Sequence, residues 1–320
     1  MVISIGVHRP EQFQGVRPDT FFGRRRGFAI DLLAEIERTG DSRIKRAFIE
    51  SITDGAGVYK RTYSGRFLAF DQHILDCMSD LQFSQPLRFL DAAVSDGSTS
   101  VEFFNGIAAH LAADFHFIAT DRDSGFLVLN RNGSLDRRVI ISAEGEIVQV
   151  VWPPFVFSGK RKDKLLLFPI NRIGHPFAMQ YARNLLKGWK ENEPDLEARE
   201  LVFACKAFRD LLAEDSRMEF KAWDIATPWT GERVHCVRAM NILNPSYFSG
   251  RQLRSIVENL TASLIDGGIL AIGSNNGPGS EVDGAIYRID GSRLLELKSS
   301  GAGVRCRQAI QSMLASSKGS

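Results

Sequence analysis

Apolar and polar positions follow two different periods along this chain, and each change of period marks an element. A short apolar run at 87–90 ends in an acid and is followed by a turn of small residues at 92–98. Apolar residues then recur at helical spacing as far as position 111, and a second apolar run at 115–120 again ends in an acid. This succession predicts strand, tight turn, helix and second strand, the βαβ unit of an open α/β sheet.

The same alternation continues in the C-terminal half. The pattern predicts an amphipathic helix at 196–212 with one apolar face. It then predicts strands at 218–223, 233–239 and 269–273, and helices at 252–264 and 308–316. Runs at 285–289 and 294–297 flank Asp290-Gly291, a pair typical of a hairpin turn. The sheet is therefore expected to be mostly parallel, with an antiparallel C-terminal hairpin.

Two further regions flank or interrupt this sheet. Helical spacing at 28–38, 44–52 and 67–81 predicts an N-terminal helical cap over residues 1–84, followed by the sheet domain at 85–320. The stretch at about 137–193 is read as a β-rich insertion, because residues 139–151 form a hairpin pattern turning at Glu144-Gly145. We interpret it as a flap over the core; a surface for an apolar substrate, a lipid interface or a partner is the alternative.

Composition narrows the function classes. The 320 residues carry a formal net charge of only +2, so we expect no nucleic-acid partner. The four cysteines are isolated in sequence, which favours free thiols in a reducing compartment. The first residues lack the basic and apolar regions of a secretory signal, and no apolar run is long enough to span a membrane. These features predict a cytoplasmic protein; the six histidines show no ligand spacing, so we expect no metal.

The turn after the first strand carries the candidate chemistry. A dinucleotide site uses G-x-G-x-x-G, but here Ala93 and Ser95 occupy the first two glycine positions and only Gly97 remains. No lysine follows, which excludes a P-loop. Asp121, at the tip of the second strand, is placed to accept both hydroxyls of a ribose. The pattern favours a nucleoside cofactor without phosphate, such as S-adenosylmethionine; a βαβ unit with no ligand is the alternative.

These motifs resemble a known family. The sequence AAVSDG at 92–97 is similar to the Ala-Ala-Cys-Ser-Thr-Gly turn of the chemotaxis-receptor (CheR-type) glutamate methyltransferases, and ATDRD at 119–123 is similar to their Ala-Thr-Asp-Ile-Asp. That family belongs to the class I S-adenosylmethionine-dependent methyltransferases. The resemblance implies a Rossmann-like class I sheet, S-adenosylmethionine as cofactor and methyl transfer as the reaction.

The resemblance also assigns residues to the cofactor. It implies that Arg61 pairs with the cofactor carboxylate and that Asp224-Ile225 receives the adenine. One departure matters: where the family has an arginine before an asparagine, this chain has Met240 before Asn241, with Arg238 as the only nearby substitute. The expected cofactor-binding residues are Arg61, Asp91, Ala93, Ser95, Gly97, Asp121, Arg122, Asp224, Ile225 and Asn241.

The acceptor side is assigned to the segment after the fourth strand. Asn241 and Tyr247 are the candidate catalytic residues, expected to orient an oxygen (carboxylate or hydroxyl) or nitrogen acceptor for in-line transfer. We expect a small-molecule, lipid or glycan acceptor rather than a protein, and a weak membrane-interface contact through 150–170 as a further option. Two other functions stay open: a non-catalytic binding or regulatory module that keeps the fold, and a nucleotide-dependent oxidoreductase, against which the missing G-x-G-x-x-G argues.

Overall fold

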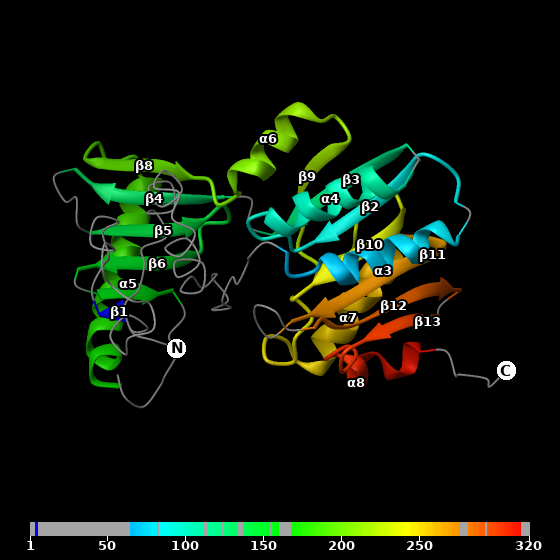
Figure 1. Cartoon of the computed structure of the whole chain (residues 1–320). Helices are drawn as coiled ribbons and strands as arrows, with labels where there is room; N and C mark the ends of the chain where they lie inside the picture. The colour runs from blue at the N-terminus through cyan, green and yellow to red at the C-terminus, as the bar shows by residue number, and fades with distance from the viewer. Residues whose placement is uncertain are drawn as a thin grey trace, which may run out of the picture. The chain divides into compact units, whose positions relative to one another are not determined.

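The computed structural model describes residues 4–5, 65–81, 83–111, 114–122, 125–132, 137–153, 155–159, 168–275, 281–291 and 293–314. The chain divides into two compact units. One unit comprises residues 63–122 and 204–320, and the other comprises residues 1–62 and 123–203. Each unit contains one β-sheet (Figure 1).

The first unit is built on a seven-stranded sheet in the order β13-β12-β11-β10-β2-β3-β9. Five of these strands are mutually parallel. Taken in chain order they are β2 (Leu87–Ala92), β3 (Phe115–Asp121), β9 (Met218–Ala222), β10 (Val234–Met240) and β11 (Leu264–Ser274). Numbered by their appearance in this unit, they lie in the order 3-2-1-4-5, the arrangement of a Rossmann-like sheet. The sheet order reverses between β2 and β10, which is where such folds bind ligands.

Two antiparallel strands complete the sheet beyond β11. β12 (Asp283–Asp290) pairs antiparallel with β11, and β13 (Arg293–Ser300) pairs antiparallel with β12 around the Asp290-Gly291 turn. Gly291 has a φ of 59°, a left-handed conformation that glycine adopts without strain. The expected α/β class, with a mostly parallel sheet and an antiparallel C-terminal hairpin, is confirmed.

Helices cover both faces of this sheet (Figure 1). α3 (Leu68–Ser79), α4 (Ser98–His110) and α6 (Lys206–Glu214) bury one apolar cluster against it. α7 (Gly250–Ala262), α8 (Arg307–Ile310) and the short 3-10 helix η5 (Gln311–Met313) bury a second cluster on the opposite face. Side chains from successive strand positions enter the two clusters alternately, for example Phe89 on one face and Leu90 on the other. The sheet is therefore buried on both sides, as its continuous apolar strands predict.

The second unit is an antiparallel sheet in the order β1-β7-β6-β5-β4-β8. Its strands are β1 (Ser4–Ile5), β4 (Phe126–Arg131), β5 (Arg138–Ser142), β6 (Ile147–Trp152), β7 (Phe155–Ser158) and β8 (Leu196–Leu201). β5 and β6 form the hairpin expected at 139–151, with its turn at Gly145. α5 (Phe168–Lys190) crosses one face of this sheet (Figure 1). The antiparallel sheet extends on both sides of the predicted insertion at 137–193, because β4 and β8 lie outside those bounds.

The predicted helix at 196–212 is wrong. Residues 196–201 form the edge strand β8, and the helix α6 begins only at Lys206. The apolar residues from Leu201 onward have helical spacing, but the preceding Glu197-Ala198-Arg199-Glu200 segment pairs with β4. Tertiary pairing therefore overrides the local helical preference there. The sequence interpretation also missed α5, and the C-terminal helix is shorter than expected.

Other predicted elements have different outcomes. The helix expected at 67–81 is confirmed as α3, which belongs to the unit of the parallel sheet. The helices expected at 28–38 and 44–52 lie outside the described residues, so the cap at 1–84 and the domain division stay predictions. Among the helices that the structure describes, none has the length and apolar character needed to cross a membrane.

Candidate functional site

The carboxyl ends of the five parallel strands meet at one edge of the sheet. Asp121 ends β3, Ala92 ends β2, and Asn241 directly follows β10. β2 lies between β3 and β10 in the sheet, so these three positions are on adjacent strand tips. Ligands of open α/β sheets bind at this edge beside the point where the strand order reverses.

The turn between β2 and α4 has an unusual backbone. Ala93 and Ser95 have φ values of 60° and 61°, and Gly97 has a φ of 76°. Left-handed conformations are uncommon for residues with a Cβ atom and are tolerated where the surrounding structure holds them. Val94 N–H donates to the Thr120 carbonyl at 3.0 Å, which fixes the turn to the end of β3.

Gly97 is required by close packing as well as by its backbone angle. A Cβ atom at this position would lie 2.3 Å from ring carbons of Phe208 in α6. The backbone also links these segments, because Cys205 N–H donates to the Asp96 carbonyl at 2.8 Å. The turn is therefore held between β3 and the beginning of α6.

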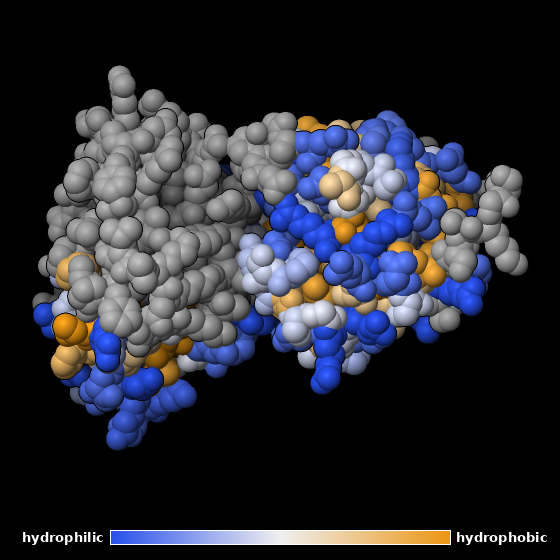
Figure 2. Space-filling view, turned by 90° about the horizontal axis from the view of Figure 1, so that it is seen from below, coloured by the Kyte–Doolittle hydropathy of each residue, from blue (hydrophilic) through white to orange (hydrophobic). Residues whose placement is uncertain are grey.

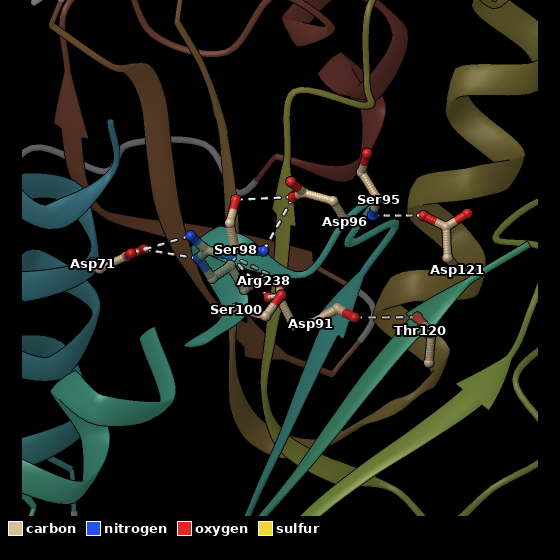
Figure 3. A network of polar contacts seen from close by, with 9 residues as sticks. All are labelled: Asp71, Asp91, Ser95, Asp96, Ser98, Ser100, Thr120, Asp121 and Arg238. Atoms are coloured by element: carbon tan, nitrogen blue, oxygen red, sulfur yellow. Dashed lines mark hydrogen bonds and ion pairs between the residues drawn. The ribbon is translucent and has the colours of Figure 1, made fainter. Parts of the chain in front are cut away.

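Asp96 occupies the N-terminus of α4 with its own carboxylate. Its Oδ1 accepts from Ser98 N–H at 3.1 Å and from the Ser98 hydroxyl at 2.9 Å (Figure 3). Asp96 is only 4% exposed. In dinucleotide-binding folds the first N–H groups of this helix face the pyrophosphate. Here a buried negative charge stands at that place, which disfavours a phosphate group.

Asp121 contacts the same turn. Its Oδ2 accepts from the backbone N–H of Ser95 at 2.7 Å (Figure 3). The carbonyl of Asp121 accepts from Trp223 N–H at 3.0 Å, so the tips of β3 and β9 are joined. The structure thus brings Ser95, Asp121 and the beginning of the 224–227 turn to neighbouring positions.

Asp91 lies inside the sheet and belongs to a buried ion cluster. Arg238 Nη1 in β10 lies 3.0 Å and 2.9 Å from the two Asp91 carboxylate oxygens. The same guanidinium donates to both oxygens of Asp71 in α3, at 2.8 and 3.1 Å. Ser100 of α4 donates its hydroxyl to Asp91 at 2.7 Å. These contacts connect two strands and two helices directly beneath the turn (Figure 3).

The ion cluster combines two carboxylates with one guanidinium, so one carboxylate charge has no matching cation in it. Burial raises the pKa of Asp71 to about 6, although the nearby Arg238 opposes the shift. Burial by itself lowers the pKa of Arg238, but the charges of Asp71 and Asp91 outweigh it and raise that pKa. Burial also raises the pKa of Glu102, which accepts from Gly65 N–H at 2.7 Å. Arg238 therefore stays charged, and the pKa of about 6 means that Asp71 gains a proton at a pH well above the ordinary carboxyl range.

Asp224 and Ile225 form a turn after β9. Asp224 Oδ1 accepts from Ala226 N–H at 2.9 Å, while its carbonyl accepts from the Thr227 hydroxyl at 2.7 Å. Ile225 is buried, and its carbonyl accepts from the Asn259 side chain of α7 at 3.1 Å. Trp223 is also buried in the core, where it packs edge-on against Trp229. The tip of β9 is therefore rigidly attached to the α7 side of the sheet.

Asn241 ties the tips of two strands together. It has a φ of 60°, and its Oδ1 accepts from Asn275 N–H at 2.8 Å. Its Nδ2 lies 3.3 Å from Asn275 Oδ1. Tyr247 is 38% exposed and follows a turn in which Asn244 Oδ1 accepts from Ser246 N–H. Asn241 therefore has a demonstrable structural contact, whereas Tyr247 presents its ring to solvent.

The structure gathers most of the predicted residues at the carboxyl edge, with two exceptions. Arg61 lies outside the described residues, and Asp91 is buried within β2. Arg122 is half-buried beside Asp121. The predicted residues on the turn or at a strand tip are Ala93, Ser95, Gly97, Asp121, Arg122, Asp224, Ile225 and Asn241. Their assignment to a ligand stays a prediction.

Sequence reasoning missed Asp71 and Asp96, and it left the role of Arg238 open. A signal for the first was present: Asp71 falls in the apolar stripe formed by Phe70, Ile74 and Met78 of α3. Arg238 likewise interrupts an apolar strand. A charge in an apolar stripe indicates a buried partner, although the pattern does not say which one. Among the described residues, no cluster of three or more His, Cys, Asp or Glu side chains is arranged to hold a metal ion.

No protein-family model and no curated protein matches this chain. Solved structures with similarity include the CMeT domain of citrinin polyketide synthase, at 14% identity and a TM-score of 0.31 over 65% of this chain. Magnesium protoporphyrin IX methyltransferase (ChlM) from Synechocystis PCC 6803 with bound SAM matches at 10% identity and a TM-score of 0.30 over 64% of this chain. CalS10, an amino pentose methyltransferase from Micromonospora echinaspora, matches at 12% identity and a TM-score of 0.30 over 72% of this chain. The chain spans 34%, 57% and 66% of those three chains. At these values the similarities carry no functional argument. The functional assignment rests on the residues of this chain.

Proposed function

We propose that the carboxyl edge of the parallel sheet binds S-adenosylmethionine and that the protein transfers the methyl group of this cofactor to an oxygen or nitrogen acceptor. The observation that carries the proposal is the position of Asp96 within the turn after β2 and of Asp121 beside that turn. Asp96 bonds the N-terminus of α4, and Asp121 bonds Ser95. Carboxylates at these two places suit a cofactor that has a ribose and a positive charge but no phosphate.

The donor and acceptor groups of the site fit this cofactor. Asp121, at the tip of β3, supplies acceptors for ribose hydroxyls. Asp224, at the tip of the neighbouring strand β9, supplies a carboxylate that accepts from an exocyclic amine such as that of adenine. In this turn Ala93, Ser95 and Gly97 carry small side chains or none, so a ligand can approach the backbone there closely.

The bound cofactor supplies an activated methyl group on a sulfonium, and transfer leaves a neutral thioether. The protein positions the acceptor and keeps water away, because an in-line displacement does not always need a base. We assign the positioning of the acceptor to the segment after β10, with Tyr247 as its most exposed aromatic group. Asn241 accepts a hydrogen bond from Asn275 and so holds in place the segment that we assign to the acceptor.

The finer assignments are also proposals. We place the chain nearest to the chemotaxis-receptor type within the class I methyltransferases, on the turn and strand-tip motifs. The acceptor is proposed to be a small molecule, lipid or glycan. Arg238 does not replace the family's arginine beside the asparagine, because its guanidinium is fully engaged by Asp71 and Asp91. All four cysteines are free thiols, which supports a cytoplasmic location.

A non-catalytic module is the second candidate. It is favoured by the hydrogen bonds of Asn241. This side chain is expected from the sequence to orient an acceptor, but in the structure it is bonded to Asn275. Such a module would bind the cofactor or a relative of it without turnover. Release of S-adenosylhomocysteine in an acceptor screen separates the two functions, since only the methyltransferase produces it.

The variant Asp121→Ala tests the site. It removes the ribose acceptor and the bond to Ser95, so we expect the affinity for S-adenosylhomocysteine to fall by about tenfold or more. Asp195→Ala is the matched control, because Asp195 pairs with Arg131 on the surface of the other unit. Thermal melting of both variants checks that they are folded. An unchanged affinity in folded Asp121→Ala would remove the site from the edge of β3.

A further inference from the structure

α5 has two chemically distinct faces. Its inner face buries Ala178, Met179, Ala182 and Leu185 against strands β4, β5, β6 and β7 of the antiparallel sheet. At about 100° per residue, these positions and the half-buried Tyr181 and Trp189 occupy one continuous side of the helix. The inner face therefore attaches α5 to the antiparallel sheet of its unit.

The outer face presents large apolar side chains to solvent. Ile173 is 64% exposed and Phe177 is 68% exposed, and they are four residues apart on the same side of the helix. Among the described residues these are the two most exposed large apolar side chains. Figure 2 shows apolar surface beside strongly hydrophilic surface on the described part of this unit.

The charged side chains of α5 itself all have one sign, and Glu191, directly after the helix, pairs with Lys187 at 3.7 Å. Arg172, Arg183, Lys187 and Lys190 are exposed, and α5 contains no acidic residue over its whole length. On a helical projection the exposed positions fill an arc of about 140°, with the cations along one margin and Ile173 and Phe177 along the other. The result is a convex surface that combines a basic margin with an apolar margin.

We propose that the outer face of α5 docks on the surface of an anionic lipid bilayer. Such a surface offers negative headgroups to the four cations and an apolar layer just beneath them to Ile173 and Phe177. Long Lys and Arg side chains reach headgroups while their apolar stems lie along the interface. A folded acidic protein offers negative charge too, but a convex helix needs a complementary groove there, whereas a lipid surface conforms to it.

The proposed contact is peripheral. The cations attract the protein to the surface, and this attraction weakens as salt screens it. The two apolar side chains add burial that salt does not screen. The proposal is independent of the proposed methyl transfer, because it concerns the other unit and makes no use of the cofactor edge.

The test is co-sedimentation of the whole protein with vesicles of phosphatidylcholine alone and of phosphatidylcholine mixed with phosphatidylserine. The unmodified protein is expected to bind only the mixed vesicles, and less at high salt. The double variant Arg183→Gln/Lys187→Gln is expected to bind roughly tenfold more weakly or worse. The double variant Ile173→Ser/Phe177→Ser is expected to bind the mixed vesicles at least about fivefold more weakly. The binding that remains should be electrostatic and should disappear at high salt.

Leu68→Ser is the matched control, because Leu68 is 54% exposed on α3 in the other unit and its replacement should change nothing. Circular dichroism confirms that each variant is folded. The proposal is overturned if the unmodified protein stays in the supernatant with phosphatidylserine vesicles, or if it binds neutral vesicles equally well. It is also overturned if the α5 variants bind like Leu68→Ser, which would assign vesicle binding to another surface, or if the protein prefers an acidic protein over the vesicles.

Discussion

Arg238 of β10 and Asp71 of α3 form a fully buried ion pair, with Nε 2.8 Å from Oδ1 and Nη2 3.1 Å from Oδ2. The other terminal nitrogen, Nη1, lies 2.9 Å from Asp91 Oδ2. Because Asp91 is the last residue but one of β2, the pair joins α3 to the strand that carries the candidate cofactor turn. The cluster makes the position of that turn depend on a helix that precedes the sheet in sequence.

Replacing the shared cation should therefore be costly. Arg238→Met leaves two buried carboxylates without their partner, so we expect the free energy of unfolding to fall by about 3–5 kcal/mol. Arg88→Met is the matched control: Arg88 lies on the neighbouring strand β2, and its pairing with Glu232 is solvent-exposed. A surface pair of this kind contributes about 0–1 kcal/mol. Urea unfolding measures both, and equal losses would contradict the central role of Arg238.

The protonation of Asp71 should make stability depend on pH. Its pKa is raised to about 6 in the folded protein and returns to an ordinary carboxyl value on unfolding, so the folded state binds the proton first. Stability from this group therefore increases as pH falls through 6 toward 4, by up to about 3 kcal/mol, and this gain is absent above pH 7.

Asp71→Asn isolates this effect. The amide cannot titrate, so the stability difference between the unmodified protein and the variant should shift in favour of the unmodified protein as the pH is lowered from 7.5 to 5. The substitution also alters the pairing with Arg238, but a stability change that is the same at every pH does not affect how the difference varies with pH. Asp76→Asn, an exposed site on the same helix, is the control. A difference that does not vary with pH for Asp71→Asn would show that Asp71 titrates normally.

Gly97 should tolerate no side chain. Gly97→Ala places a Cβ atom against the Phe208 ring and also strains a φ of 76°, so we expect a loss of about 2–4 kcal/mol. Gly145→Ala separates the two causes, because Gly145 has a φ of 82° and nothing within 4 Å of its Cβ position. Strain alone costs about 1 kcal/mol. Thermal melting compares the two, and a similar loss at both positions would mean that the Phe208 contact is not restrictive.

Asn241 should hold the segment after β11 in place. Asn241→Ala removes the acceptor for Asn275 N–H and puts alanine at a φ of 60°, for an expected loss of about 1–3 kcal/mol. Hydrogen exchange gives the specific readout: the Asn275 amide should exchange faster in the variant. Asn241→Asp keeps an acceptor oxygen and should preserve most of that protection. Unchanged exchange in Asn241→Ala would show that the side-chain bond is not maintained in solution.

Much of the parallel sheet could be predicted from the sequence, because its strands are continuous apolar runs bounded by turns. Acids at or near the ends of β2, β3 and β9 also indicated the carboxyl edge in the sequence. The edge strand β8 was missed because its exposed Leu196–Leu201 segment carries no apolar alternation, and its pairing with β4 is a tertiary feature. α5 was missed because Gly174, Pro176 and Gly188 interrupt its pattern.

The site was predictable in position but not in its contacts. Asp91 and Asp121 each follow an apolar run in the sequence, yet Asp91 pairs with Arg238 inside the sheet and Asp121 accepts from the turn. Sequence spacing gives no means of telling these two roles apart, since they depend on which side chain of β10 and α3 lies opposite. The capping role of Asp96 was likewise hidden within a turn of small residues.

The most direct test of the proposed function is calorimetric titration of the unmodified protein with S-adenosylmethionine and S-adenosylhomocysteine, with NAD as the comparison ligand. The carboxylates of Asp96 and Asp121 should admit the first two at micromolar concentrations and exclude the pyrophosphate of NAD. Binding of NAD, or the absence of any binding by the two adenosyl compounds, would contradict the assignment of this sheet edge to S-adenosylmethionine.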